Sequence, residues 1–258
     1  MLILITNDDG VESQGLATLR KVGEAIGGEC WVCAPEQNHS GAGHSLSLNE
    51  PVRIRKLDER TFAVRGTPTD SVIMGIHHVL KGRTPDLILS GINRGSNLAE
   101  DVTYSGTIAA CFEGTLLGIR SIALSQAFGP DSKPNPKWQT PLAHAPAIIR
   151  TLIDTEWTPS TLYSINFPDR EPADVQGVSV TVQGRRDAGL LSLDERHDTW
   201  GNPYFWLAYR RSRSEAPEKT DLWAIANGRI SVTPLSIELT HRPSLERLAA
   251  ALTTASKP

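Results

Sequence analysis

The sequence predicts an α/β protein built on a largely parallel β-sheet with helices on both faces. Its 258 residues are 39% hydrophobic and 21% charged, which is enough apolar material for one substantial core without disulfides or a structural metal. In the first half, short apolar runs of strand length alternate with segments of helical spacing. The apolar runs are continuous, as is typical of parallel strands buried on both faces.

The first half supplies the expected elements in chain order. Strands are predicted at residues 2–6, 30–34, 86–90 and 121–124, and helices at residues 14–26, 70–80 and 107–117. The first of these helices has apolar residues at helical spacing and ends at Gly27-Gly28. The polar tetrad at 58–61 separates two short β-like runs and predicts a hairpin inserted into the alternation.

The second half changes character after Pro168. Residues 178–182 and 204–209 have β composition and are joined by long polar stretches. We interpret residues 170–240 as a β-rich excursion, used for contacts between subunits, within a single domain that spans residues 1–258. A terminal helix is expected at 244–252, with Ser244 as its N-cap.

Composition limits the classes of function. The net charge of -3, with acids and bases interspersed, argues against a dedicated nucleic-acid binder and predicts no stable nucleic-acid partner. It leaves anionic small molecules open, because local donors bind phosphate whatever the overall charge. The chain shows no secretory signal and no apolar run long enough for a membrane span, so a cytoplasmic protein without a membrane partner is expected.

The three cysteines are expected to be buried, reduced thiols. Cys30 and Cys33 form a C-x-x-C pair, a spacing that also suits redox chemistry or half a zinc site. Their segment has strand character, in which positions i and i+3 point to opposite faces. Cys111 leaves no second pair to complete a zinc site.

The loop Asn7-Asp8-Asp9-Gly10 follows the first predicted strand and is the first candidate for chemistry. Adjacent side chains diverge on an extended strand, so a shared ligand requires a turn here, and Asn, Asp and Gly favour turns. Two hard carboxylate oxygens suit Mg²⁺, Mn²⁺ or Ca²⁺. Acids that cap the following helix are the alternative interpretation, and the dipeptide alone leaves both open.

Three further polar loops follow predicted strands or open a helix. Residues 35–45 offer hydroxyls and two imidazoles, of which His39 or His44 could be a ligand, a proton shuttle or a plain loop residue. Residues 90–97 offer two asparagines. Ser105-Gly106-Thr107 opens a helix and could be an anion cradle or a simple N-cap. In a parallel sheet such loops share the carboxyl edge, so together they indicate metal-assisted phosphoryl hydrolysis.

At these residues the sequence resembles the SurE family of stationary-phase survival proteins, which are 5′/3′-nucleotidases. The resemblance is densest in the first 115 residues and then continues more weakly along the chain. It is carried by ILITNDDGVESQGL (3–16), APEQNHSGAGHSLSL (34–48), GTPTDSV (66–72), LILSGINRGSNLAEDVTYSGTIAACFEG (87–114), SINFP (164–168) and TDLWAIANGRISVTPL (220–235).

The resemblance implies a Rossmann-like core that hydrolyses nucleoside monophosphates with one divalent cation per subunit, Mg²⁺ or Mn²⁺. It implies cleavage of short polyphosphate and a homodimer or homotetramer with an exchanged C-terminal arm. Ala99 stands where the family usually has glycine. The family's metal ligands fall on Asp8, Asp9, Ser40 and Asn93, and its phosphate-binding residues on Asn97, Ser105, Gly106 and Thr107.

The mechanism hypothesised from the sequence is direct attack of a metal-bound water on phosphate, with Asp8 or Asp9 orienting or deprotonating that water. A phosphatase with Asp8 as covalent nucleophile is one alternative, although such enzymes use Asp-x-Asp and here the acids are adjacent. A non-catalytic metal-dependent nucleotide sensor is a second. An RNA-binding module using Arg185-Arg186 and 210–213 is a third; these arginines could equally lie on solvated loops or at subunit contacts.

Overall fold

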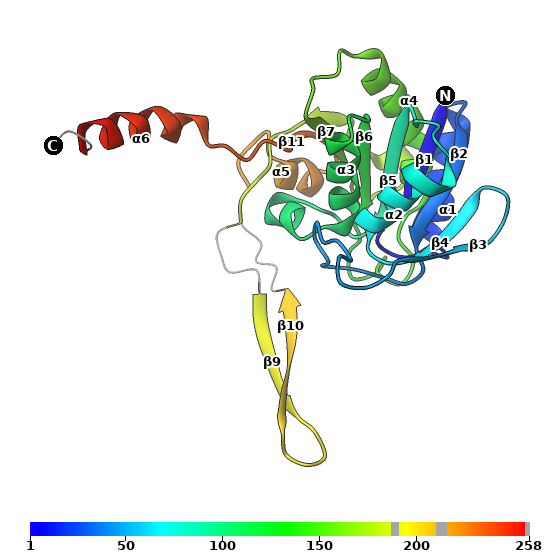
Figure 1. Cartoon of the computed structure of the whole chain (residues 1–258), viewed down its shortest axis with the longest axis horizontal. Helices are drawn as coiled ribbons and strands as arrows, with labels where there is room; N and C mark the ends of the chain where they lie inside the picture. The colour runs from blue at the N-terminus through cyan, green and yellow to red at the C-terminus, as the bar shows by residue number, and fades with distance from the viewer. Residues whose placement is uncertain (187–190, 210–215, 256–258) are drawn as a thin grey trace.

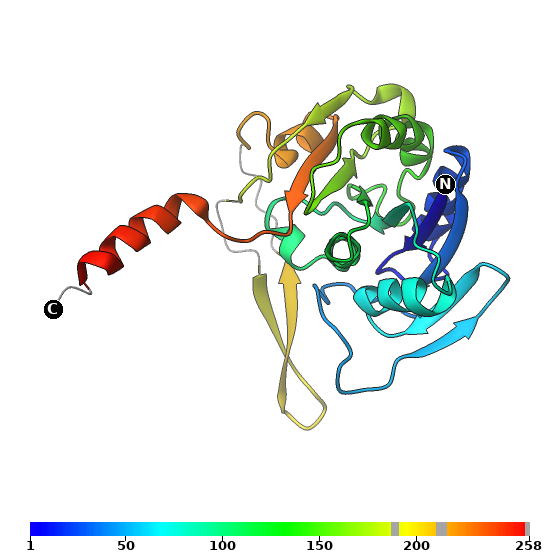
Figure 2. The same ribbon diagram turned by 45° about the horizontal axis from the view of Figure 1, so that its top comes forward.

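The computed structural model describes residues 1–186, 191–209 and 216–255, and shows a nine-stranded sheet covered by helices (Figures 1 and 2). The strand order is β3-β4-β2-β1-β5-β6-β7-β11-β8, and the six strands from β4 to β7 run parallel. The sheet strands are β1 (Leu2–Thr6), β2 (Glu29–Pro35), β3 (Arg53–Lys56), β4 (Thr61–Arg65), β5 (Leu87–Arg94), β6 (Ser121–Gln126), β7 (Thr161–Phe167), β8 (Val178–Val180) and β11 (Ile230–Ser236).

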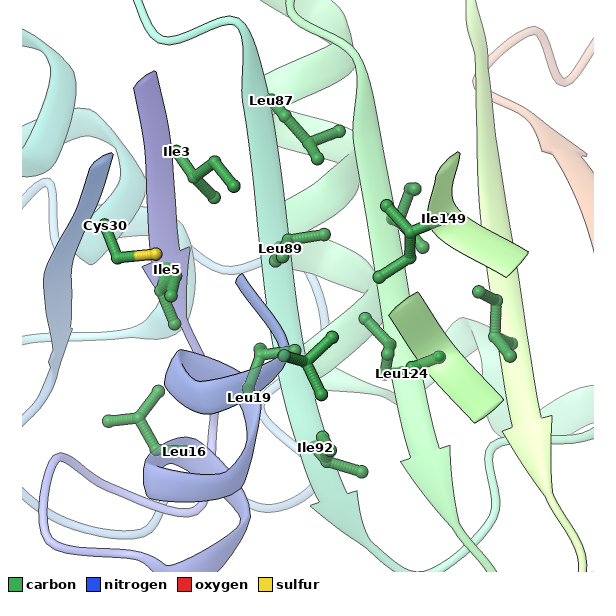
Figure 3. Packing of buried hydrophobic residues seen from close by; sticks show 14 of the residues in the cluster. Ile3, Ile5, Leu16, Leu19, Cys30, Leu87, Leu89, Ile92, Leu124 and Ile149 are labelled. Carbon is green, nitrogen blue, oxygen red and sulfur yellow. The ribbon is translucent and has the colours of Figure 1, made fainter. Parts of the chain in front are cut away.

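Helices lie on both faces because each strand of the parallel core is apolar on both sides. One face packs on α1 (Gln14–Ala25) and α4 (Gln139–Asp154), in the cluster shown in Figure 3, which includes Leu19, Ile149 and Leu89. The other face packs on α2 (Pro68–Met74), the π-helical turn Gly75–Val79 and α3 (Gly106–Leu116). These two layers hold the loops at the carboxyl edge of the sheet on a rigid base.

The predicted α/β class is confirmed, and so are the predicted elements of the first half, within a few residues at their ends. Strand β5 is the exception, because it continues four residues beyond the predicted end at Ser90 and carries Asn93 on the strand. Gly91 makes this possible: its φ is +132°, and a Cβ there would lie 2.3 Å from the carbonyl oxygen of Leu124. The strand bulges there and resumes its pairing with β6.

The described part of residues 170–240 contributes strands and a helix to the main body and forms one separate hairpin. Strands β8 and β11 extend the main sheet, and α5 (Asp221–Ala226) packs on β11. Strands β9 (Leu191–His197) and β10 (Pro203–Tyr209) pair only with each other among the described residues and project from the body (Figure 1). Short 3-10 turns lie at Ala99–Thr103 and Pro172–Asp174.

The terminal helix α6 (Arg242–Ala255) extends away from the body (Figures 1 and 2). The prediction of Ser244 as its N-cap was wrong, because the helix begins two residues earlier. Pro243 favours that start, since its fixed φ and missing N–H suit the first helical turn. The Ser244 hydroxyl instead lies 2.6 Å from Nδ1 of His241.

The cysteines lie as expected for structural thiols. Cys30 packs in the α1/α4 cluster and Cys33 in the opposite one, as predicted for positions i and i+3 on a strand. All three are free and buried, and burial raises the pKa of Cys30 to about 11 and that of Cys33 to about 12. Among the described helices, none is long and apolar enough to cross a membrane.

Candidate active site

The chain order of the strands reverses beside β1, which lies between β2 and β5. In open α/β sheets the ligand crevice lies beyond the carboxyl ends of the strands at such a switch point. The loop after β1 and the end of β5 meet there, so the predicted residues of both segments come to the same edge.

The loop after β1 leaves the strand at once, as a shared ligand requires. Asn7 donates from Nδ2 to the carbonyl of Gly10 at 2.9 Å and to Oγ of Ser13 at 2.7 Å, which closes the turn. The carbonyl of Asp8 accepts the amide of His39 at 2.8 Å, and this bond joins the turn to the loop after β2. The turn therefore takes Asp8 and Asp9 out of the strand, with the two carboxylates close enough for the charge of Asp9 to raise the pKa of Asp8.

The two carboxylates have different surroundings. Asp8 is only 4% exposed, and its Oδ1 accepts the Thr107 hydroxyl at 2.5 Å. Burial raises its pKa to about 6, the Thr107 hydrogen bond opposes this, and repulsion from Asp9 adds to it. Asp9 is half-buried and accepts the Arg94 amide at 2.9 Å and Nδ2 of Asn38 at 3.3 Å; burial also raises its pKa.

One cavity of about 200 Å³ gathers five of the eight predicted site residues. Its lining includes Asp8, Ser40, Asn93, Asn97 and Ser105, which come from four separate segments of the chain. It also includes residues that the sequence did not single out: Arg94, Asp101, Tyr104 and Phe128.

Asp9 lines a neighbouring cavity of about 220 Å³ with Asn38 and Trp138, and Arg94 borders both cavities. A larger hollow of about 610 Å³ contains none of the predicted residues. Neither imidazole lines the cavity with Asp8: His39 borders a different hollow, and Nε2 of His44 lies 3.0 Å from Oε2 of Glu113.

The start of α3 forms the base of the site. Ser105 is the N-cap, and its Oγ accepts the Ile108 amide at 3.1 Å. The amides of Gly106 and Thr107 are then the first-turn donors without an intrahelical acceptor. Gly106 is required there, because a Cβ would lie 2.8 Å from Cβ of Asp8. Thr107 is fully buried and interacts with Asp8 through both its hydroxyl and its backbone amide, so the Gly106 amide is the first-turn group left for an anion.

Asn97 is held by two residues that the sequence reasoning did not identify. Asn166 lies on β7. Its Oδ1 accepts the backbone amide of Asn97 at 2.9 Å, and its Nδ2 donates to the backbone carbonyl of Asn97 at 3.2 Å. Ser125, on β6, accepts Nδ2 of Asn97 at 2.9 Å. The signal for Asn166 was its place in the SINFP stretch, directly after an apolar run. No local pattern marked Ser125.

The site residues fit a divalent cation by their chemistry. Two carboxylates, a hydroxyl and an amide are all hard oxygen donors, and Asn93 uses its Nδ2 on the Gly95 carbonyl, which leaves its Oδ1 for a ligand. Within the described ranges, no lysine, arginine or histidine forms an ion pair with Asp8 or Asp9. Burial raises the pKa of Asp9 and the charge of Arg94 opposes that rise, and a cation would add the positive charge that the buried Asp8 lacks.

Comparisons with known proteins identify one family. The family model described as Survival protein SurE matches residues 3–189. A protein of Methylorubrum extorquens (strain PA1) named 5′-nucleotidase SurE is 55% identical over 251 residues, covering 97% of this chain and 99% of its own. One of Parvibaculum lavamentivorans with the same name is 52% identical, covering 99% and 92%. The crystal structure of SurE from Aquifex aeolicus matches with a TM-score of 0.85 and 36% identity, covering 97% and 99%.

Proposed function

This chain belongs to the SurE family of survival proteins, and from that we propose that it is a 5′-nucleotidase that uses one Mg²⁺ or Mn²⁺ per subunit to release phosphate from nucleoside monophosphates. The observation that carries the proposal is the cavity that brings Asp8, Ser40 and Asn93 together with the phosphate-binding candidates Asn97 and Ser105. Both relatives are named 5′-nucleotidase SurE, and each matches nearly the full chain.

The cation would be held by Asp8, Asp9, Ser40 and Asn93. When bound, it supplies charge neutralisation to the phosphate and polarises a water molecule. The protein holds the two carboxylates in fixed positions through Thr107 and the Arg94 amide. Fixed ligands lower the cost of assembling the site, because little side-chain freedom remains to be lost.

Phosphate would bind at the start of α3. The Gly106 amide, the Thr107 segment beside it and the helix dipole favour an anion, and Asn97 and the Ser105 segment complete the cradle. These donors lie beside the carboxylates because Thr107 contacts Asp8 directly. The same donors would stabilise the charge that develops on the non-bridging oxygens in the transition state.

Hydrolysis would proceed by direct attack of water on phosphorus, with Asp8 or Asp9 orienting the water and accepting its proton. Asp8 is poorly placed as a covalent nucleophile, because Oδ1 is bonded to Thr107 and Gly106 packs against its Cβ. Trapping a phosphorylated Asp8 during turnover would contradict the scheme. A sensor without turnover remains the second candidate, and it would bind nucleotide and cation without releasing phosphate.

The proposal extends to 3′-monophosphates and to short polyphosphate. The residues assigned to the cation and the phosphate would contact only the phosphoryl end of a substrate, so they would impose no rule on the group attached to it. We expect phosphate release from 5′-AMP, 3′-AMP and tripolyphosphate. Release from 5′-AMP alone would restrict the proposal to 5′-nucleotides.

The protein would act as a homodimer or homotetramer. The β9–β10 hairpin exposes Trp206 and Leu207 by 59% and 70%, and α6 exposes Leu245 by 58%. An isolated two-stranded ribbon is marginally stable in water. We therefore expect a second copy of the chain to pack against these apolar surfaces and bury them. Trp206→Ser with Leu207→Ser should lower the mass measured by light scattering. Leu48→Ser, at an exposed site on the body, is the control.

A reducing, cytoplasmic setting is part of the proposal, since all three thiols are free and buried.

The central test is phosphate release from 5′-AMP by purified protein with Mn²⁺, with Mg²⁺ and with EDTA. Asp9→Asn should lose most activity, because a neutral amide replaces an anionic ligand. Asp154→Asn removes an equal charge at the exposed end of α4, outside the residues of the site. This variant should release phosphate as fast as wild type. Full activity in EDTA, or in Asp9→Asn, would defeat the proposal.

A further inference from the structure

A carboxylate lies in the wall of the proposed phosphate cavity. Asp101 lines it together with Asn97 and Ser105, and its side chain is only 12% exposed. An uncompensated negative charge at this place would oppose binding of a phosphate dianion. The metal-ligand candidates are negative or neutral, and Arg94, which lines the same cavity, forms no ion pair with Asp101 among the described residues.

Arg186 compensates that charge from a distant part of the chain. Its Nη2 donates to Oδ2 of Asp101 at 2.8 Å and its Nη1 to Oδ1 at 3.2 Å, the two-pronged geometry of a strong arginine–carboxylate pair. The same guanidinium reaches the Leu98 carbonyl at 3.1 Å and Glu100 at 3.4 Å. The Arg186 side chain is 7% exposed, so solvent screens the pair weakly.

Other residues share the work of holding this loop in place. Asp221 accepts the Ala99 amide at 2.8 Å, and Gln183 donates to the Ala99 carbonyl at 2.9 Å. Asp101 itself accepts the Ser105 amide through its carbonyl at 3.0 Å. The path of the backbone from Asn97 to Ser105 therefore has anchors besides Arg186, whereas the charge of Asp101 is paired by Arg186 alone among the described residues.

We propose that Arg186 is a positioning residue that neutralises Asp101 and thereby sets the affinity of the cavity for phosphate. The inference rests on the proposed function, since it takes this cavity as the phosphate site. It also places Arg186 behind Asp101, with a buried side chain, instead of on a solvated arginine face for nucleic acid. The companion segment 210–213 lies outside the described residues.

The test is the affinity for inorganic phosphate, measured by calorimetry with Mn²⁺ present and again as competitive inhibition of 5′-AMP hydrolysis. Arg186→Gln should weaken phosphate binding on the order of tenfold, because it exposes the cavity to the Asp101 charge. Asp101→Asn alone should bind phosphate as tightly as wild type or more tightly. The double variant Arg186→Gln/Asp101→Asn should regain most of the lost affinity.

The rescue separates a role through charge from a purely structural one. If Arg186 only supports the loop, the double variant, which lacks the same contact, will bind phosphate as weakly as the single variant, and the inference fails. Removing one partner of a buried pair can also unfold a protein, whereas the double variant removes both charges and stays testable. Thermal melting of each variant establishes that it is folded.

Arg229→Gln is the matched control. Arg229 donates to Ser179 and to carbonyls on and beside β8 and lines no part of the cavity, so its loss should leave phosphate affinity unchanged. An equal loss in Arg229→Gln would also overturn the inference. Failure of the proposed function is distinguishable, because then wild type itself would release no phosphate from 5′-AMP.

Discussion

Replacing Asp8 with asparagine should stabilise the cation-free protein while abolishing its activity. Burial raises the pKa of Asp8 from 3.8 to about 6. Folding therefore disfavours the ionised form of Asp8. The free energy of unfolding falls as the pH rises from about 3.8, the pKa in the unfolded chain, through about 6, the pKa in the folded protein. A shift of about 2 pKa units corresponds to roughly 3 kcal/mol at pH 8, and about half of that has developed by pH 5.

Asparagine removes the charge but keeps an oxygen that can accept the Thr107 hydroxyl. After about 1 kcal/mol for the weaker hydrogen bond, Asp8→Asn should gain about 2 kcal/mol at pH 8 in EDTA. For a chain of this size the gain corresponds to a melting temperature roughly 4–8 °C higher. The gain should be smaller at pH 5, where the wild-type carboxyl is largely protonated.

The assay is denaturant unfolding at pH 5 and pH 8, in EDTA and with Mn²⁺. Saturating Mn²⁺ should stabilise wild type by about 3 kcal/mol at a concentration 100 times its dissociation constant and should act much less on the variant. Asp154→Asn serves as the control for a change of surface charge. The reasoning is refuted if Asp8→Asn is destabilised equally at both pH values, or if Mn²⁺ stabilises both proteins alike.

Three other substitutions or treatments have definite expected outcomes. Ala99 has φ +52° in a fully buried turn, so Ala99→Gly should gain about 0.5–1 kcal/mol in denaturant unfolding; a loss of stability would contradict the strain argument. Gly106→Ala should lose about 1–3 kcal/mol and most phosphate release, because its Cβ meets Asp8; unchanged activity would exclude the tight contact. Cys30 and Cys33 should resist Ellman's reagent at pH 8 until the protein unfolds, since burial raises the pKa of both; fast labelling of the native protein would show the strand interpretation to be wrong.

Local pattern was sufficient for the parallel core except β7, which was not predicted. The helix after β1 was predictable because its apolar residues recur at helical spacing, and the strand character of the C-x-x-C segment correctly placed its thiols on opposite faces. Helix α4 was not predicted. Its sequence includes Pro146, a residue that usually ends or interrupts a helix, and packing on α1 overrides that signal.

The sequence by itself determined which residue types stand at the carboxyl edge of the sheet. Alternating elements bring successive loops to one edge, so Asp8, Asn93 and Ser105 could be expected together without any knowledge of distances. The bend of β5 at Gly91 was not predictable, because its reason is the approach of the Leu124 carbonyl from another strand.

Only the tertiary structure decided which residues support that edge. Asn166 holds Asn97 across 69 positions of sequence, and Arg186 meets Asp101 across 85. No periodicity records such a contact, because both partners look like ordinary polar residues in their own surroundings. The reason is physical: spacing along the chain encodes a residue's face on its own element, whereas its partner depends on how several elements pack together.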